Sequence, residues 1–429
     1  MEAAILGFAV VLALAFLGVP LGYVLLLVGI GGFATLRGID PALSMAGQQI
    51  IHIATNHELS VLPLFCLMGS FIHRSRMSED LYDAANAFVG HRRGGLAMAT
   101  IAACAGFAAV SGSSVATAAT MSRVAMPPMR RYRYADSLAA GAIAAGGTLG
   151  ILIPPSVPMV IYGLLTETDI GRLFIAGILP GLLLTALFML SIYAVVAIRP
   201  GWGPSGERVP WRGRLRTLWK VWAILTLFLI VLGGIYLGVF TPTEAAAIGA
   251  TGAFAFTLGR GAFSIGETFG ALVEAARITA MLFVVLFGAL TFSNFITLSG
   301  MVSQLVAWLE ALNLSPLGVV AMMCVIYLIL GAVFDSLAML LLTVPIFFPI
   351  VTSLGLDPIW FGIVVIIVIE AGLISPPIGI NVFVVQSVLP DVSLWRIYAG
   401  VWPFLLAMIA ALALVLVFPS ISLFLPGPM

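Results

Sequence analysis

Polar breaks interrupt the two longest apolar stretches of this chain, and the residue types of the first break suit ion binding. It is formed by Ser111, Gly112, Ser113 and Ser114, midway along the apolar residues 94–128. Backbone that leaves the helical form inside a bilayer exposes N–H and C=O groups, which are tolerated only where they line a cavity or are buried in protein. Hydroxyl and carbonyl oxygens suit a cation such as Na⁺, and helix N-termini at such a break favour an anion. The alternative is close helix packing through small residues.

Each apolar segment that follows a polar break carries a pair of prolines. Residues 150–155 are GILIPP, and residues 372–377 are GLISPP. Because proline has no N–H donor, each pair leaves nearby carbonyl groups, such as those of Gly150 and Ile153, without a helical partner. A proline kink without a ligand is the alternative. Since both pairs follow a polar break, an ion site in each half explains the pattern better.

Three further polar side chains lie near the second break and the second proline pair. Asp335 is the only acidic residue in the apolar stretch 316–350, where a carboxylate is costly and usually functional. It could bind a cation, relay protons or cap a helix that starts at Ser336. Glu370 and Asn381 flank the second proline pair, and Glu370 could be a second intramembrane acid or the partner of an arginine.

The composition places these residues inside a membrane protein. The 429 residues are 62% hydrophobic and 9% charged, whereas soluble chains carry roughly 25% charged residues. The net charge of +1 gives no sign of a polyanionic partner, so we expect no nucleic acid. The only lysine, Lys220, precedes Val221, whereas the phosphate-binding loop of an ATPase needs Lys followed by Ser or Thr. We therefore expect a polytopic membrane protein that is not itself an ATPase.

Apolar segments suited to membrane helices recur along the whole chain. We expect spans or partial spans at residues 3–18, 20–36, 59–73, 137–153, 173–198, 217–239, 242–258, 279–297, 359–374 and 398–425. The first segment lacks a basic start and is too long for a signal sequence, so we expect a retained membrane helix. Amphipathic segments near 42–56, 79–90, 264–278 and 300–312 are typical of helices that lie in the membrane interface.

The two halves of the chain repeat each other at an offset of 222 residues. The corresponding features are Pro20 with Pro242, Ser113 with Asp335, Pro127 with Pro349, Gly150 with Gly372, and Pro154-Pro155 with Pro376-Pro377. One or two matches could arise by chance, but five without a gap indicate a duplication. We expect a first repeat in residues 1–198, a cytoplasmic linker rich in Pro, Gly and Arg in residues 199–216, and a second repeat in residues 217–429.

Charges at the ends of the two long apolar stretches indicate opposite orientations. Residues 91–93 (HRR) and 130–133 (RRYR) put both ends of the first stretch on the cytoplasmic side, so it enters and leaves by the same face. The second stretch lies within residues 278–395, which contain no Lys or Arg, so its ends belong on the opposite face. Only Arg37 and Arg172 of the 19 Lys and Arg residues then lie outside. We predict an all-α fold of two inverted-topology repeats, each with a re-entrant helical hairpin (about 94–128 and 316–350) and a discontinuous helix (about 137–166 and 359–390).

The motifs around the breaks resemble those of the large membrane (M, DctM-like) subunit of TRAP (tripartite ATP-independent periplasmic) transporters. They are AAVSGSSVATAATMSRVAMPPM and GGTLGILIPPSVPMVIYG in the first half, and GAVFDSLAMLLLTVPIFFPIVTSLGLDPIWFG and EAGLISPPIGINVFVVQ in the second. The segments ELSVLPLFCLMGSFI (58–72) and GGLA (94–97) also fit, so the resemblance covers nearly the whole chain. One position departs: the family commonly has Asn two residues before the acid that matches Glu370, and this chain has Val368 there.

The resemblance implies a multi-pass protein of the bacterial inner membrane that imports an organic acid, often a carboxylate. Na⁺ would be the coupling ion, and no organic cofactor is implied. The family is similar to elevator transporters, in which a transport domain carrying both hairpins slides against a scaffold. A periplasmic binding protein delivers the substrate, and a small membrane subunit, which we expect on a separate chain, braces the large one.

The resemblance also implies which residues form the sites. A first Na⁺ site is expected at Ser111, Gly112, Ser113, Ser114, Gly150, Ile153 and Pro155. A second is expected at Gly331, Asp335, Gly372, Ser375 and Ile378. The substrate is expected between the hairpin tips, near Ser113, Ser114, Pro154, Asp335, Ser336, Pro376 and Asn381.

Three other functions compete with this interpretation. The first is a stand-alone Na⁺/dicarboxylate or citrate-type symporter that needs no binding protein. The second is an intramembrane aspartyl protease, whose chemistry needs two facing aspartates. The position that corresponds to Asp335 holds Ser113, so we expect a transporter rather than an enzyme. The third, a purely structural membrane protein, would not need two broken-helix sites.

Overall fold

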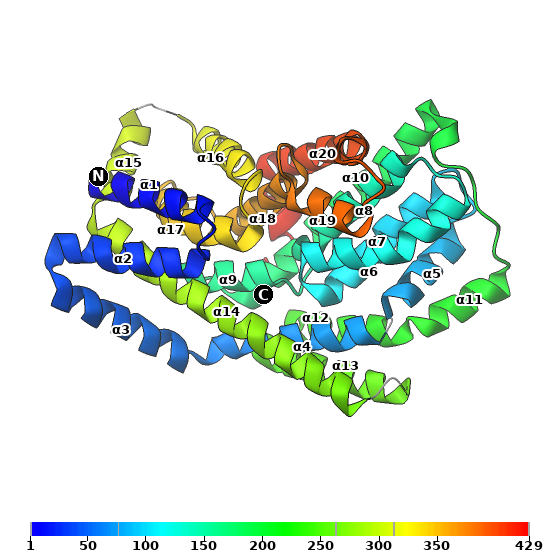
Figure 1. Ribbon diagram of the computed structural model, residues 1–429, viewed down its shortest axis with the longest axis horizontal. Coiled ribbons are helices and arrows are strands. Elements are labelled where there is room, and N and C mark those ends of the chain that lie inside the picture. Colours follow the sequence, from blue (N-terminus) through cyan, green and yellow to red (C-terminus); the bar gives the residue numbers. More distant parts are fainter. Residues whose placement is uncertain (1, 76, 262–263, 312–313, 428–429) are drawn as a thin grey trace.

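The computed structural model describes residues 2–75, 77–261, 264–311 and 314–427, and these residues form helices and no strand (Figure 1). Helices satisfy their backbone hydrogen bonds within one segment, which an apolar chain needs in lipid. The helices of the first half are α1 Glu2–Phe16, α2 Leu21–Arg37, α3 Ile39–Thr55, η1 His57–Ser60, α4 Val61–Arg74, α5 Met77–Val89, α6 Gly95–Ser111, α7 Ser114–Arg131, α8 Asp136–Leu152, α9 Val157–Thr166 and α10 Ile170–Ile198. Those that follow are η2 Pro200–Trp202, α11 Trp211–Lys220, α12 Trp222–Tyr236, α13 Pro242–Gly259, α14 Ile265–Leu298, α15 Met301–Ala311, α16 Pro316–Gly331, α17 Ser336–Ser353, α18 Pro358–Ile374, α19 Ile380–Val388, α20 Leu394–Val417 and α21 Ser420–Leu423.

Several of these helices are suited to crossing a bilayer. By length and composition, the described part of the chain has five such segments: Asp136–Thr166, Ile170–Ile198, Ile265–Leu298, Ser336–Ser353 and Leu394–Val417. Two more result if each bent pair counts as one span, namely Ile39–Thr55 with His57–Arg74 (58°) and Trp211–Lys220 with Trp222–Tyr236 (53°). The prediction of an all-α polytopic membrane protein is confirmed.

Several of the expected segments have other boundaries in the structure. Residues 217–239 do not form one helix, because the chain bends at Val221 and separates the basic α11 from the apolar α12. Residues 264–278 and 279–297 belong to one continuous helix, α14, of 34 residues. No proline or glycine lies between Gly270 and Gly288 to interrupt it. At 1.5 Å per residue α14 is about 51 Å long, more than the roughly 30 Å of a bilayer core, so it can cross such a core only by tilting or by extending beyond it.

The helix boundaries repeat with the offset found in the sequence. After a shift of 222 residues, α7 coincides with α17 and α8 with α18 at both ends. The helices α6 and α7 pack together as a first hairpin, and α16 and α17 pack together as a second. In Figure 1 the first hairpin extends from the centre to one side of the molecule and the second extends to the other.

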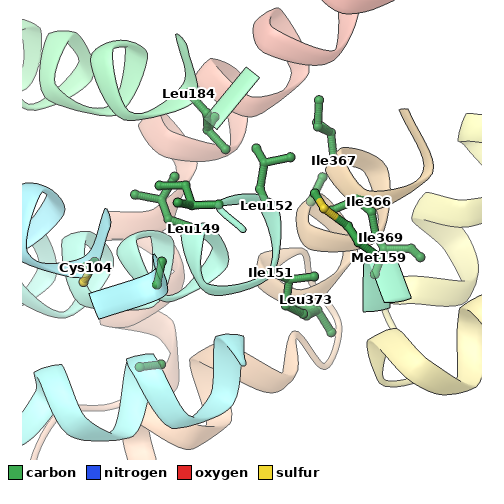
Figure 2. Packing of buried hydrophobic residues seen from close by; sticks show 14 of the residues in the cluster. Cys104, Leu149, Ile151, Leu152, Met159, Leu184, Ile366, Ile367, Ile369 and Leu373 are labelled. Carbon is green, nitrogen blue, oxygen red and sulfur yellow. The ribbon is translucent and has the colours of Figure 1, made fainter. Parts of the chain in front are cut away.

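The helices α8 and α18 lie at the centre and position the two proline breaks. Residues 359–374 of α18 are buried on every side, which explains why nearly every position of this helix is apolar. Residues 138–152 of α8 are buried as well, and their many Ala and Gly residues let α6, α7 and α20 approach closely. Figure 2 shows this packing around Leu149 and Leu152 of α8 and Ile366 and Ile367 of α18.

The two halves cross at their proline breaks. Each central helix packs against its own hairpin, α8 against α6 and α7, and α18 against α16 and α17. The short helix after each break packs against the hairpin of the other half: α9 contacts α17, and α19 contacts α7. Both hairpin tips and both breaks are therefore brought to the middle of the molecule.

Candidate functional site

A cavity of about 420 Å³ lies where the two hairpin tips meet. Its volume is within the range of small-molecule sites. The tips line it with Ser111, Gly112, Ser113 and Ser114 from the first hairpin and Asp335, Ser336 and Leu337 from the second. Ile151 and Leu373, which occupy equivalent positions in the two repeats, also line it and lie beside each other in Figure 2. The cavity is thus centred on the two polar breaks.

Four helices begin at this cavity. Ser114, Ser336, Val157 and Ile380 are the first residues of α7, α17, α9 and α19, and all four line it. The first N–H groups of a helix have no partner within the helix and carry a partial positive charge. Helix ends that converge in this way favour an anionic group in the space between them.

Ser113 and Asp335 hold the two tips by capping the helices that follow them. The Ala116 N–H donates to Ser113 Oγ, and the Ala338 N–H donates to Asp335 Oδ1, both at 3.3 Å. Ser and Asp are preferred at this position because their side-chain oxygens accept from an otherwise unpaired N–H. Asp335 therefore has the capping role considered for it, and its residue also lines the cavity.

The first tip rests directly on the first proline break. Gly112 has a positive φ of 58°, and a Cβ atom there would lie 3.1 Å from the carbonyl oxygen of Pro155. A Cβ atom on Gly150 would lie 2.6 Å from the carbonyl oxygen of Ser113. Only glycine permits this approach of backbone to backbone. The structure thus brings Gly112, Ser113, Gly150 and Pro155 of the first predicted ion site together.

Thr117 belongs to the same contact and was missed by the sequence analysis. Its Oγ1 donates to the Ser113 carbonyl at 2.8 Å and lies 2.7 Å from Ser111 Oγ. Its position one turn into α7 was the available signal, since residues three to four apart share a helix face. Ile153 is placed differently from the glycines, because it directly follows α8 and its side chain is turned towards Gly181 of α10.

The second predicted ion site is assembled only in part. Gly331 and Gly372 are in contact, since a Cβ atom on Gly331 would lie 2.7 Å from Gly372 Cα. The Ser375 hydroxyl donates to the Ala371 carbonyl of its own helix at 2.6 Å. The Ile378 carbonyl accepts a hydrogen bond from the Tyr398 hydroxyl, a partner that the sequence gave no reason to expect.

The residues expected to contact substrate divide into two groups. Ser113, Ser114, Asp335 and Ser336 line the cavity, whereas Pro154, Pro376 and Asn381 are not among its lining residues. Asn381 is wholly buried in α19, where its Nδ2 donates to the Ala144 carbonyl of α8 at 3.5 Å. Its Oδ1 is buried without a hydrogen-bond partner in the described part of the chain. The geometry gives Asn381 a place in the packing of α19 on α8.

Glu370 is wholly buried in α18 and is bonded to the first hairpin tip. The Ser114 hydroxyl lies 2.6 Å from Glu370 Oε1 and 2.8 Å from Oε2, so it donates to this carboxyl group. Of the two alternatives considered for Glu370, a partner arginine is not found, because none of the ion pairs within the described residues involves it. The bond joins the two halves of the chain. Val368, which replaces an expected Asn, is buried in the same helix.

Two helix faces of mostly small residues form the cavity walls away from the tips. Cys66, Gly69, Ser70 and His73 share one face of α4, and Ala116, Ala119, Thr120 and Arg123 share one face of α7. Glu274, Ile278 and Leu282 of α14 complete the lining on this side. These walls were not predicted from the sequence, although both faces show the same spacing of three and four residues.

Comparisons with known proteins find transporter subunits that are similar to this chain over most of its length. The family model of the tripartite ATP-independent periplasmic transporter, DctM component, matches residues 8–421. The chain is 38% identical to the C4-dicarboxylate TRAP transporter large permease protein DctM of Pseudomonas aeruginosa, over 93% of each chain. It is 33% identical to the sialic acid TRAP transporter large permease protein SiaM of Vibrio cholerae, over 97% of this chain and 96% of that one. A further relative, 33% identical over 97% of each chain, is the ectoine/5-hydroxyectoine TRAP transporter large permease protein UehC of Ruegeria pomeroyi. The solved YdaH transporter of Alcanivorax borkumensis has the same fold, with a TM-score of 0.62 and 16% identity over 89% of each chain.

Proposed function

The chain belongs to the DctM family of tripartite ATP-independent periplasmic transporters, and from this premise we propose that it imports an organic acid together with Na⁺. As a member of this family it is a transporter subunit of the inner membrane rather than an enzyme. A large permease of this family acts with a small permease and a periplasmic binding protein, which we expect on separate chains. The relatives are named for C4-dicarboxylates, sialic acid and ectoine, so the family alone leaves the substrate open.

The observation that carries this proposal is the meeting of four helix N-termini and two hairpin tips in one cavity. The helix dipoles and the N–H groups that remain after capping favour an anion such as a carboxylate. The carbonyl and hydroxyl oxygens at the two breaks suit Na⁺. We assign one Na⁺ to the contact of Ser111, Gly112, Ser113 and Ser114 with Gly150, Ile153 and Pro155, and a second to Gly331, Asp335, Gly372, Ser375 and Ile378. Na⁺ bound beside the anion would lower the cost of moving its charge through the membrane.

An elevator movement fits the way the helices pack. The hairpins and the central helices α8 and α18 contact one another across both halves, so they would move as one body. The face of α4 and the face of α7 that line the cavity both consist mostly of small side chains. Such surfaces interlock little, and sliding would therefore meet few steric barriers. On this proposal α4 and α14 belong to the scaffold.

The test is uptake by the complete transporter in proteoliposomes. The chain and its small subunit are reconstituted, the binding protein is added outside, and a panel of radiolabelled organic acids is supplied with an inward Na⁺ or K⁺ gradient. We expect uptake of one class of acid with the Na⁺ gradient and the binding protein only. Uptake without the binding protein would favour the stand-alone symporter, and equal uptake with K⁺ would contradict Na⁺ coupling.

Three Ser→Leu variants test whether Na⁺ binds at the two proposed ion sites. Ser113→Leu and Ser375→Leu should abolish Na⁺-dependent uptake, because each puts a bulky apolar side chain at a proposed ion site. Ser387→Leu, at an exposed position of α19, is the control and should transport normally. Undiminished uptake by the first two variants would contradict the ion-site assignment.

A further inference from the structure

The part of the cavity lining that lies away from the hairpin tips includes an arginine with no ion-pair partner among the described residues. Arg123 lines the cavity from α7 and is solvent-exposed there. None of the ion pairs in the described part of the chain involves it. Its guanidinium group is therefore free to bind an anion that enters the cavity.

The only acidic side chain on the same wall is already paired elsewhere. Glu274 of α14 lies 3.2 Å from an Arg74 nitrogen, and Arg74 also binds Glu267. This cluster fixes the end of α4 to α14. The remaining acid of the lining, Asp335, is on the second hairpin tip, where it caps α17. Arg74 is therefore shared by two carboxylates, and Arg123 is the arginine of the cavity lining that forms no ion pair within the described residues.

Two further polar side chains lie beside Arg123. Thr120 is one turn earlier on the same face of α7, and its Oγ1 lies 3.4 Å from Nδ1 of His73 on α4. The hydroxyl group and the imidazole ring both offer hydrogen-bond donors to an anion. These three side chains and Glu274 form a polar end to a cavity whose walls away from the tips are otherwise small or apolar.

The distance from this polar end to the hairpin tips suits a short diacid. Arg123 follows Ser114 by nine positions, which is about 13.5 Å along the helix axis. Side chains of a helix lean towards its N-terminus, so the Arg123 side chain points back towards the tip and shortens the gap. Between them, Ala116 and Ala119 leave room along the wall. An acid with two anionic groups a few carbon atoms apart fits between the helix N-termini and Arg123.

We propose that Arg123 binds the second anionic group of the substrate, so that the chain selects short dicarboxylic acids over monocarboxylic acids. This rests on the proposed function, because the first carboxylate is placed at the tips of that site. A guanidinium group binds a carboxylate through two parallel hydrogen bonds, which makes it a selective reader of such a group. A monocarboxylic acid held at the tips leaves Arg123 unused and gains nothing from it.

The experiment measures ligand binding directly, without transport. The full chain is purified with its small subunit, and its melting temperature is followed during titration with malonate, succinate or glutarate and with the monomethyl ester of each. A ligand that binds the folded state raises the melting temperature according to its concentration relative to Kd. We expect the best diacid to act at a concentration at least about tenfold lower than its ester, as a lost charge-assisted hydrogen bond implies.

Three variants assign this preference to Arg123. Arg123→Gln should reduce the diacid-to-ester ratio to about one, and Arg123→Lys should keep part of it, because Lys retains the charge without the paired donors. Arg131→Gln removes the same charge from the end of the same helix, outside the cavity lining, and should keep the wild-type ratio. The inference is overturned if wild-type protein shows no preference, if Arg123→Gln retains it, or if Arg131→Gln loses it equally.

The outcome is separable from that of the proposed function. If the diacid preference depends on Arg123 but uptake does not depend on Na⁺, the proposed Na⁺ coupling is contradicted and the role of Arg123 is supported. If uptake is driven by Na⁺ but wild-type and Arg123→Gln protein discriminate diacids from their esters equally well, the role of Arg123 is contradicted and the Na⁺ coupling is supported.

Discussion

Replacing Gly150 by alanine should displace the first hairpin tip and weaken Na⁺ binding. The added Cβ atom would lie 2.6 Å from the Ser113 carbonyl oxygen and 2.8 Å from Thr117 Oγ1. The first of these is a backbone atom, so no rotamer change relieves the contact. To reach ordinary contact at 3.4 Å, the tip must retreat by about 0.8 Å.

The size of this shift sets the expected effect. Oxygen ligands of hard cations lie at roughly 2.3–2.6 Å, so a displacement of about 0.8 Å removes the Ser113 carbonyl from any ion that it binds. We expect the Na⁺ affinity to fall at least about tenfold, or about 1.4 kcal/mol. Overpacking should also lower the free energy of unfolding by about 1–3 kcal/mol, partly offset by the roughly 1 kcal/mol helix preference of Ala over Gly.

The assay is the melting temperature of the purified complex as Na⁺ replaces K⁺ at constant ionic strength. Gly31→Ala is the matched control, because Gly31 lies within α2 and a Cβ atom there meets nothing within 4 Å. The control should keep the wild-type midpoint for Na⁺, while Gly150→Ala shifts it to higher concentration. A wild-type midpoint in Gly150→Ala would refute the reasoning, since the tip would then accommodate the methyl group without losing an ion ligand.

Three other predictions concern the tip, the topology and the surface. Ser114→Ala removes the donor to buried Glu370 and should lower the free energy of unfolding by about 1–3 kcal/mol, measured by thermal or denaturant unfolding; an unchanged stability would show that the carboxyl group finds another donor. Cysteines introduced at positions 132 and 356 should react with impermeant thiol reagents from opposite faces of the membrane, and labelling from one face would contradict the inverted repeats. The hydrogen bond from Arg130 lowers the pKa of the exposed Asp391 below its ordinary value of 3.8. Its contribution to stability is therefore present above pH 3.8 and is lost as the pH falls through the lowered pKa. Asp391→Asn should accordingly lower the melting temperature at pH 7 but not at the acid end of a pH series, and an equal effect at both would argue against the ion pair.

The repeat architecture could be predicted because it depends on residues that end helices. Prolines, glycines and capping residues act locally, so their positions in the sequence determine where helices begin and end. The equal spacing of Ser113 and Asp335, and of Gly150 and Gly372, was therefore enough to predict the duplication. The boundaries of α7 and α17, and of α8 and α18, show it again in the structure.

Contacts between distant segments could not be predicted in this way. Glu370 was singled out as a buried acid, but nothing near it in the sequence identifies Ser114 as its partner. The wall that α4 contributes to the cavity depends on how two helices lie side by side, which local residue types do not determine. Asn381 was expected near the substrate from the family resemblance, and its contact with the Ala144 carbonyl of α8 depends on how α19 packs on α8. The bend at Val221 arises where basic and apolar helices meet.

The hydrogen bond between Ser114 and Glu370 has a consequence for biosynthesis. The two residues are 256 positions apart, and the ribosome adds roughly 5–20 residues per second. Glu370 is therefore synthesised roughly 13–50 s after Ser114, and the hydrogen bond between them cannot form before then. Helix α19, which covers α7, is made later still. The first hairpin of the nascent chain therefore enters the membrane without its contacts to α18 and α19. It reaches its final packing only when translation is nearly complete.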